Sequence, residues 1–253
     1  MKLKISLVSL TSCSGCISAL MSLDIFPEVI ERTAFIYSPL IADYEKFEEC
    51  DITFVEGCVS DEPEIDILKN LRKHSKKLYA LGTCAAFGGI LSLSKKQGAK
   101  AISNFIEIDG IIPGCPPPAH LLGNIIMRLI ENLDLELPIR NLCATCPLRN
   151  SLDLNSDINI SKFIPELDEI VPIEEQTECF LKQGILCLGP ITREGCELKC
   201  IKLGIPCEGC MGPVSKDFTS NVINFLSLTN LSGNLRKYKG IFYRFSKPLL
   251  RGW

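Results

Sequence analysis

The sequence predicts an α/β protein in which a doubly wound parallel sheet is followed by an irregular, cysteine-rich domain. Apolar runs alternate with stretches of helical spacing along residues 1–138. Such strand–helix alternation is typical of a parallel sheet. After Leu137-Pro138 this periodicity stops, and residues 139–215 hold eight of the fourteen cysteines. The two regions are therefore expected to fold on different principles.

The strands of the sheet are predicted from short runs of apolar and β-branched residues. In chain order these runs are Lys2–Ser9, Ala34–Tyr37, Ile52–Val55, Leu78–Leu81 and the shorter Ile111–Ile112. In a sheet of this kind, ligands sit outside the carboxyl ends of the strands. The loops that follow these strands are therefore the first place to look for a site.

The helices are predicted from apolar residues at helical spacing. They are Ile17–Glu31, Glu64–Lys76 and Ala119–Leu133. Pro63 lies near the start of the second helix, where its missing N–H costs little. Each of these helices connects or follows strands, as a doubly wound fold requires.

These patterns divide the chain into three parts. Residues 1–138 are predicted to form a flavodoxin-like domain, residues 139–230 an irregular, cysteine-rich domain, and residues 231–253 a basic tail. Because it lacks long-range periodicity, the irregular domain is expected to build no normal apolar core, and metal ligation is expected to supply folding energy there. Within it, residues 150–175 have the composition of an acidic, helix-bearing insertion.

Composition excludes several classes of function. A net charge of −3 over 253 residues argues against nucleic acid as the main partner. No apolar run approaches the roughly 18 residues of a transmembrane segment. The first residues imitate a lipoprotein signal, but Ile5–Leu10 is shorter than the apolar region of about 7–15 residues that such a signal needs. A cytoplasmic location with metal-bound cysteines is expected.

Twelve of the fourteen cysteines fall into three sets of four. The first set is Cys13, Cys16, Cys84 and Cys115; the second is Cys143, Cys146, Cys179 and Cys187; the third is Cys196, Cys200, Cys207 and Cys210. Four thiolates are what a cubane iron–sulfur cluster needs as ligands. Three such sets in one chain indicate a route for electrons.

The first set is favoured by topology as well as by number. All four of its cysteines follow predicted strands, so one edge of the sheet can gather them although they are far apart in sequence. Glycines beside them allow backbone N–H groups to approach the sulfurs of a cluster. The spacing of Cys13-Ser-Gly-Cys16 alone also fits a redox-active dithiol, but a dithiol leaves Cys84 and Cys115 unexplained.

The eight later cysteines have a competing interpretation. Cys143-Ala-Thr-Cys146 and Cys207-Glu-Gly-Cys210 have the spacing of zinc ribbons, and two Cys₄ zinc sites would use all eight thiols. A zinc-stabilised scaffold is therefore an alternative for this region. Spacing alone does not separate the two kinds of site.

A set of motifs in fixed order resembles the small subunit of [NiFe] hydrogenases. These motifs are Leu10-Thr-Ser-Cys-Ser-Gly-Cys16, Val55-Glu-Gly57, Gly82-Thr-Cys84, Gly114-Cys-Pro-Pro117, Cys179-Phe-Leu-Lys-Gln-Gly-Ile-Leu-Cys187 with Leu-Gly-Pro190, Thr192-Arg-Glu-Gly-Cys196 and Pro206-Cys-Glu-Gly-Cys-Met-Gly-Pro213. The resemblance covers about residues 3–215. Within this family, the sequence is most similar to small subunits of the cytoplasmic, group 3 enzymes. These include sulfhydrogenase delta subunits and the gamma subunits of F420-reducing and F420-non-reducing hydrogenases.

This resemblance implies a role for each set of cysteines. The first set would hold a proximal [4Fe-4S] cluster facing a large subunit, the third a medial cluster and the second a distal one. Membrane-bound members place a histidine where Cys143 stands, and their medial cluster commonly lacks a cysteine like Cys200. Because all three sets are complete here, three [4Fe-4S] clusters are expected.

The resemblance also implies the partners and the reaction. The chain would be an oxidoreductase subunit acting on H₂ without H₂ chemistry of its own, because the nickel–iron centre belongs to the large subunit. Electrons would pass to a flavin or iron–sulfur subunit that serves F420, NAD(P), polysulfide or a heterodisulfide reductase. The alternative is a single-cluster relay that resembles the 20-kDa subunit of NADH–quinone oxidoreductase.

Other residues receive weaker interpretations. Glu56 matches an acidic position of the family, where it would help proton movement, and a capping carboxylate is the alternative. Cys50 and Cys58 are expected to be small buried residues rather than ligands. His74 and His120 are assigned no role. The basic tail is expected to dock on a partner subunit, and an arm that binds nucleic acid or a membrane is the alternative. Its basic residues are Arg236, Lys237, Lys239, Arg244, Lys247 and Arg251.

Overall fold

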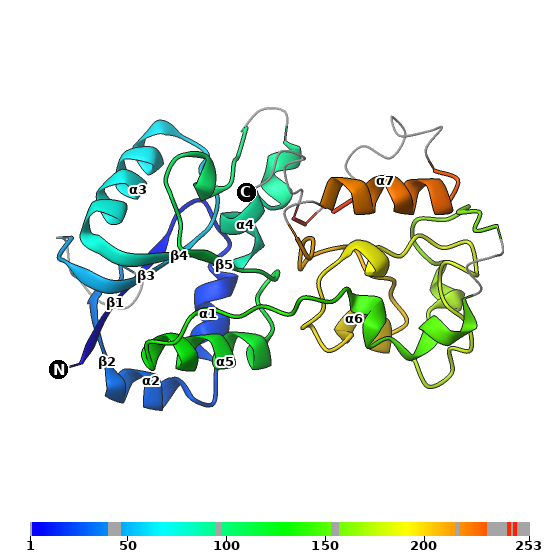
Figure 1. Ribbon diagram of the computed structural model, residues 1–253, viewed down its shortest axis with the longest axis horizontal. Helices are drawn as coiled ribbons and strands as arrows, with labels where there is room; N and C mark the ends of the chain where they lie inside the picture. The colour runs from blue at the N-terminus through cyan, green and yellow to red at the C-terminus, as the bar shows by residue number, and fades with distance from the viewer. Residues whose placement is uncertain are drawn as a thin grey trace. The chain divides into compact units, whose positions relative to one another are not determined.

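The computed structural model describes residues 2–39, 47–94, 98–152, 157–215, 218–231, 242–243 and 245–246. The chain forms two compact units, and the boundary falls between Leu137 and Pro138. The first unit holds the whole sheet (Figure 1). No helix among the described residues is long and apolar enough to cross a membrane.

The sheet of the first unit has five parallel strands, as the sequence predicts. They are β1 (Leu3–Ser9), β2 (Thr33–Tyr37), β3 (Cys50–Glu56), β4 (Ser75–Leu81) and β5 (Gly110–Ile112). Their order in the sheet is β2-β1-β3-β4-β5, and every neighbouring pair is parallel. Helices cover both faces of the central strands, and the last four residues of β3 and of β4 are all buried.

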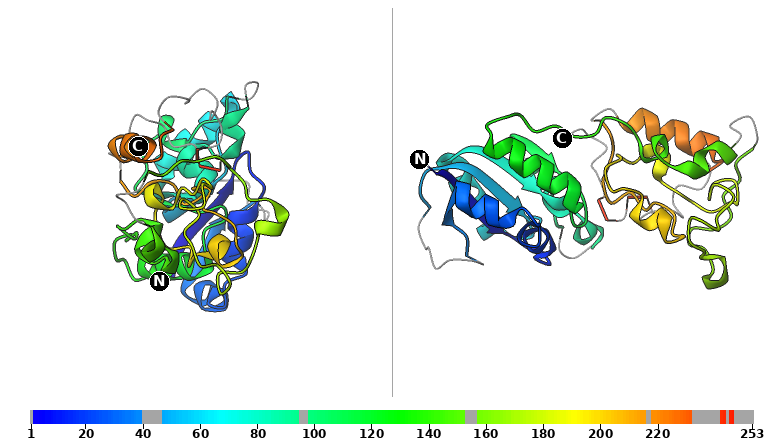
Figure 2. Two further views of the ribbon diagram at one scale, coloured as in Figure 1. Left: turned by 90° about the vertical axis from the view of Figure 1, so that its right-hand side faces the viewer. Right: turned by 90° about the horizontal axis from the view of Figure 1, so that it is seen from below.

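Helices cover the two faces of this sheet. Helices α1 (Gly15–Met21), α2 (Phe26–Arg32) and α5 (Ala119–Ile130) pack together on one face, and α3 (Glu62–His74) lies on the other. Figure 2 shows α1 and α5 side by side across the sheet. Two short 3₁₀ helices and α4 (Gly82–Phe87) complete the unit; the 3₁₀ helices are η1 (Ile90–Leu93) and η2 (Ile102–Asn104).

The long helix predicted over Ile17–Glu31 is wrong, because the structure divides it into α1 and α2. Pro27 lies in the first turn of α2, where a proline begins a helix but could not sit inside one. The turn before it buries Leu23, which is 7% exposed. Apolar spacing continues through the turn because both short helices cover the same core, so the pattern alone did not reveal the break.

The other two helices differ from prediction at their ends. Helix α3 begins two residues early because the Asp61 carboxylate accepts a hydrogen bond of 3.1 Å from the N–H of Glu64 and caps the first turn. It ends at His74, since β4 begins at Ser75. Helix α5 ends at Ile130, three residues before the predicted end.

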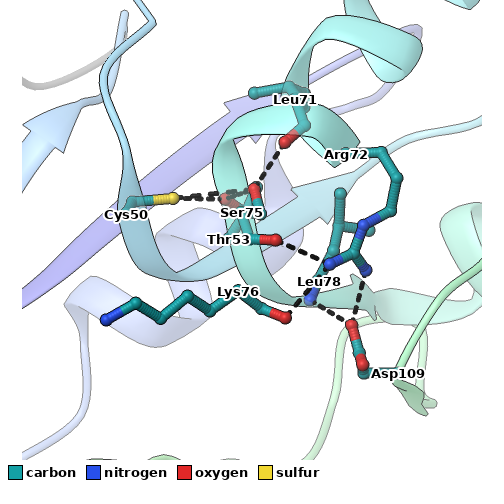
Figure 3. A network of polar contacts seen from close by, with 8 residues as sticks. All are labelled: Cys50, Thr53, Leu71, Arg72, Ser75, Lys76, Leu78 and Asp109. Atoms are coloured by element: carbon teal, nitrogen blue, oxygen red, sulfur yellow. Dashed lines mark hydrogen bonds and ion pairs between the residues drawn. The ribbon is translucent and has the colours of Figure 1, made fainter.

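A polar network ties α3 to the amino ends of β3 and β4 (Figure 3). The Arg72 guanidinium donates to the carbonyl of Ser75 at 2.6 Å and to the carboxylate of Asp109 at 2.6 Å. The same Asp109 oxygen accepts from the N–H of Leu78 at 2.7 Å. These bonds fix the tight connection between α3 and β4. They lie at the amino end of the sheet, whereas the first set of cysteines follows the carboxyl ends of the strands.

Cys50 belongs to the same network and is buried among hydroxyl groups. Its side chain is 3% exposed, and its Sγ lies 2.9 Å from Oγ1 of Thr53. Thr53 Oγ1 lies 2.6 Å from Oγ of Ser75, which donates to the carbonyl of Leu71. Cys50 is at the amino end of β3, remote along the strand from the carboxyl edge.

The second unit consists mainly of loops and short helical turns. Its helices are η3 (Leu142–Ala144), η4 (Pro147–Ser151), η5 (Leu167–Glu169), η6 (Gly189–Ile191), α6 (Lys199–Lys202) and α7 (Phe218–Leu228). The helix expected within residues 150–175 is not present in the described part of that segment, where only η5 and the end of η4 are helical. The acidic residues there serve short turns and ion pairs such as Lys162–Glu169.

The expectation that this unit has no normal apolar core is wrong. Its loops bury a contiguous cluster that includes Leu142, Phe180, Ile185, Leu188 and Phe225. Except for Phe225, which lies in α7, these residues come from loops and short turns without helical or strand periodicity, so a pattern search misses the core they form. Several cysteines of the second and third sets pack into the same cluster.

Candidate iron–sulfur sites

The first set of cysteines lies at the carboxyl edge of the sheet. Cys13 and Cys16 follow β1, Cys84 lies in α4 directly after β4, and Cys115 follows β5. Strands β1, β3, β4 and β5 are consecutive in the sheet. Their post-strand loops therefore meet, as the sequence predicts.

Electrostatics indicate how close these four thiols lie. Burial raises the pKa of Cys16 most, the nearby Glu56 carboxylate adds to the increase, and Cys84, Cys115 and Cys13 contribute further. Burial likewise raises the pKa of Cys84 to about 12, with contributions from Cys115 and Cys13. If all four were ionised, their thiolates would repel one another in this partly buried place. A ligand rich in cations would hold all four as thiolates.

Two glycines make room for the sulfur atoms of this set. A Cβ atom at position 82 would lie 2.2 Å from Sγ of Cys16, and one at position 89 would lie 2.5 Å from Sγ of Cys84. Both glycines also have positive φ, at 82° and 62°. The loops are thus shaped around the sulfur positions, and the residues fit a cluster held by this set.

Glu56, the last residue of β3, is a buried carboxylate beside the first set. It is 1% exposed, and its Oε2 accepts from the backbone N–H groups of Cys16 at 3.1 Å and Ile17 at 3.0 Å. Its Oε1 accepts from the hydroxyls of Ser9 at 2.8 Å and Ser12 at 3.2 Å. These contacts agree with the interpretation of Glu56 as a capping carboxylate, because they fix the loop that carries Cys16.

Cys58 lies closer to the first set than its place in the sequence suggests. It is fully buried, and its thiol donates to the carbonyl of Thr11 at 3.5 Å. Burial and then the Glu64 carboxylate raise its pKa to about 11. Cys58 also adds to the raised pKa of Cys84. The sequence feature that could have indicated this closeness is the position of Cys58, two residues after Glu56.

The second set lines one cavity of the second unit. The cavity has a volume of about 940 Å³, and Cys143, Cys146, Cys179 and Cys187 all contribute to its wall. Gly189 lies between two of the sulfurs, since a Cβ there would be 3.1 Å from Sγ of Cys143 and 3.5 Å from Sγ of Cys187. Burial, followed by the other three thiols of the set, raises the pKa of Cys143.

Backbone N–H groups point at the sulfur atoms of the second set. Cys146 receives them from residues 148 and 149, Cys179 from residues 181 and 182, and Cys187 from residues 189 and 207. Donors of this kind stabilise thiolate rather than thiol, and they are the usual surroundings of iron–sulfur sulfurs. The donor set and its cavity therefore fit a cluster.

Electrostatic coupling links the third set in two pairs. After burial, Cys196 adds to the raised pKa of Cys200, whereas the pKa of Cys207 is raised first by burial, then by Cys187 of the second set and less by Cys210. Cys207 also contacts the second set directly, because its N–H donates to Sγ of Cys187 at 3.3 Å. The N–H of Leu188 in turn donates to the carbonyl of Cys207 at 2.8 Å.

Among the described residues, no three His, Cys, Asp or Glu side chains form a group that would hold a single metal ion in this arrangement. Each of the two histidines makes a local contact. Nδ1 of His74 lies 2.9 Å from the carbonyl of Asn70, and Nε2 of His120 lies 3.3 Å from the amide of Asn124. The basic side chains of the predicted docking tail lie outside the described residues.

Comparison with known proteins relates the whole chain to hydrogenase subunits. The family described as "NADH ubiquinone oxidoreductase, 20 Kd subunit" matches residues 13–129. A subunit of the F420-non-reducing hydrogenase vhu of Methanocaldococcus jannaschii is 31% identical, over 88% of this chain and 87% of that protein. The delta subunit of sulfhydrogenase 2 of Pyrococcus furiosus is 26% identical, over 83% of this chain and 86% of that protein.

Solved structures share the fold. A chain of the actinobacterial-type NiFe-hydrogenase from Ralstonia eutropha H16 superposes with a TM-score of 0.65 over 94% of this chain and 87% of that chain, at 15% identity. A chain of the [NiFeSe] hydrogenase from Desulfovibrio vulgaris Hildenborough gives 0.63 over 84% of this chain and 94% of that chain, at 19% identity. The likeness extends beyond the sheet into the second unit.

Proposed function

Because the chain belongs to the family of iron–sulfur small subunits of [NiFe] hydrogenases, we propose that three [4Fe-4S] clusters make it the electron relay of such an enzyme. As a hydrogenase subunit in electron transfer, it is part of an oxidoreductase that acts on H₂. The observation that carries the proposal is the grouping of twelve cysteines into three complete sets. Each set offers four sulfur ligands, which is the number a cubane cluster requires.

The residues proposed to hold each cluster follow the three sets. Cys13, Cys16, Cys84 and Cys115 would hold the proximal cluster; Cys196, Cys200, Cys207 and Cys210 the medial one; Cys143, Cys146, Cys179 and Cys187 the distal one. Clusters of this type supply one-electron storage at a potential that the protein tunes. The chain contributes the thiolates, the N–H groups aimed at them and the exclusion of water.

The proposed partners are a large subunit that carries the nickel–iron centre and an acceptor subunit with flavin or iron–sulfur groups. The names of the relatives from Methanocaldococcus and Pyrococcus, both subunits of hydrogenases, support a complex of several subunits, and a cytoplasmic location is part of this proposal. The acceptor would be served by the distal set. Its all-cysteine ligation favours a low potential, since histidine ligands raise the potential of such centres.

Metal analysis of the chain tests the proposal. Anaerobically purified protein should contain about twelve irons and no zinc per chain, because each of three cubanes holds four irons. Two zincs with about four irons would instead support the zinc-stabilised alternative for the second unit.

A single-cluster relay is the second candidate, and the match of residues 13–129 to the 20 Kd subunit of NADH ubiquinone oxidoreductase favours it. That candidate predicts about four irons, all bound by the first unit. A Cys143→Ser variant distinguishes the two, because it lowers the iron content only if the second set holds a cluster.

A further inference from the structure

The C-terminal segment places one aromatic side chain inside the second unit. Tyr243 is 4% exposed and belongs to the apolar core of this unit. Its ring meets Phe218 edge-on, with ring centroids 6.4 Å apart. Its hydroxyl donates to the buried carbonyl of Ile191, at the end of η6. The side chain is therefore held at the ring and at the hydroxyl.

The ring of Tyr243 lies directly on the loop between two cysteines of the third set. A Cβ atom at Gly209 would be 2.6 Å from Cδ1 and 3.2 Å from Cε1 of the Tyr243 ring. Gly209 stands between Cys207 and Cys210 and has a φ of 84°. Only a residue without a side chain lets the ring reach this backbone, so the loop and the ring fit each other.

Electrostatic coupling supports the same placement. Burial raises the pKa of the Tyr243 hydroxyl, and the Cys207 thiolate adds to that increase. A side-chain hydrogen bond with Thr192 counteracts the increase for both Tyr243 and Cys207. The tyrosine and the cysteine thus share one buried neighbour, Thr192, which is 1% exposed.

We propose that Tyr243 is a positioning residue that covers the third set of cysteines, holds the Cys207–Cys210 loop and keeps water from its cluster. This inference rests on the proposed function, since it requires a cluster at the third set. The other cysteines of this set are more open than Cys207: Cys200 is exposed and Cys196 partly exposed. Solvent access is one of the factors that set the potential of such a cluster.

The test compares three variants in the complete chain by anaerobic iron release to a chelator. Tyr243→Ala should release about one third of the iron, the share of one cubane in three, many times faster than the rest. Tyr243→Phe keeps the ring and should release iron at the wild-type rate. Phe242→Ala is the matched control, because Phe242 is the adjacent residue and packs on Phe225 instead, with centroids 6.3 Å apart.

A second measurement reports on the cluster itself. In a redox titration followed by EPR, the third-set signal of Tyr243→Ala should move to higher potential, because water stabilises the more negative reduced form. The signals of the other two sets should stay unchanged. If the alanine variant does not fold, Tyr243→Leu, which keeps an apolar side chain over Gly209 but no ring, takes its place in both measurements.

Two results would overturn the inference. In the first, Tyr243→Ala releases iron as slowly as the wild type, or equally fast from all sites. In the second, Phe242→Ala releases one third of its iron as fast as Tyr243→Ala does. Failure of the proposed function looks different, because wild-type protein would then contain about four irons before any substitution is made. Wild type with about twelve irons and an unchanged Tyr243→Ala variant would remove this inference alone.

Discussion

Single glycines determine where the sulfur atoms of the first set can lie. At Gly82 two constraints coincide: a positive φ, which L-residues rarely adopt, and a sulfur atom in the place where a Cβ would be. The sequence could indicate that glycines accompany the cysteines. Which sulfur each glycine accommodates depends on loops that are distant in the chain, so only the structure reveals that Gly82 makes room for Cys16 rather than for its neighbour Cys84.

Replacing this glycine should disrupt the first site. Gly82→Ala would place a methyl group 2.2 Å from Sγ of Cys16, and we expect purified protein to lose about four irons. The measurement is iron per chain together with the EPR spectrum of the reduced protein. Gly123→Ala is the matched control, because its Cβ would meet only Cδ1 of Ile25 at 3.4 Å. Full iron content in Gly82→Ala would contradict the assignment of the first set.

The charge of Glu56 should tune the same site. Glu56→Gln keeps the size of the side chain and an oxygen for the N–H groups of Cys16 and Ile17, but it removes a buried negative charge. The reduced, more negative form of the cluster is then easier to reach, and the potential of the first site should rise on the order of 60 mV, a tenfold change for one electron. A redox titration measures it, with Glu28→Gln on exposed α2 as control. An unmoved potential would leave Glu56 with a purely local capping role.

At the scale of elements, strands were predictable and helix breaks were not. Each strand contains a short apolar run, such as Leu78–Leu81 in β4, and these runs locate every strand to within a few residues. The Ile17–Glu31 region was misjudged because α1 and α2 present apolar residues to one core with a helical period that continues across the turn. Pro27 was the available signal for the break. It outweighs periodicity because a proline ring blocks the preceding turn.

The amino ends of three strands are joined by one carboxylate, and this predicts a pH dependence. Asp51 on β3 accepts from Nζ of Lys76 at 2.7 Å and from the N–H of Lys4 at 2.9 Å. The hydrogen bond from Lys76, followed by that from Lys4, lowers the pKa of Asp51 below its usual 3.8. A lowered folded-state pKa adds stability above the unfolded value, and this stability is lost as the pH falls through the folded value.

The Asp51→Asn variant should therefore be less stable than wild type near neutral pH, and the difference should shrink below about pH 4. Urea unfolding of both proteins at about pH 7 and about pH 3 measures the two free energies of unfolding. Asp66→Asn serves as control, since Asp66 is exposed and its ion pair with Lys69 is long, at 4.0 Å. A difference that is independent of pH would show that the ionised carboxylate is not the stabilising group.

At the scale of the whole molecule, the sequence predicts the sheet of the first unit better than the packing of the second unit. The number and spacing of the cysteines predict a chemistry for them, whereas no sequence pattern predicts the apolar core among the loops. Phe180, Ile185 and Leu188 are buried by contacts between irregular segments, and such contacts leave no period in the sequence. The direct contact of Cys207 with Cys187 is equally non-local and could not be predicted from spacing.

The proposed order of the clusters predicts how a defect in the second set affects the assembled enzyme. In a complex with its large subunit, Cys146→Ala should leave H/D exchange at the metal centre nearly intact and slow the reduction of dyes, because only the exit of electrons needs the distal site. Cys50→Ala is the control, since Cys50 lies in the hydroxyl network of Figure 3. Equal loss of both activities in Cys146→Ala would contradict the distal assignment.

The spread of the first set along the chain, from Cys13 to Cys115, has a consequence for biogenesis. No partial product of translation that ends before β5 can offer all four sulfurs, and a sheet with one strand misthreaded cannot bring them together. The proposed proximal cluster would therefore form only on a correctly threaded sheet. A ribosome-bound fragment stopped before Cys115 should remain iron-free there, whereas a fragment that extends beyond α5 should be able to acquire its metal.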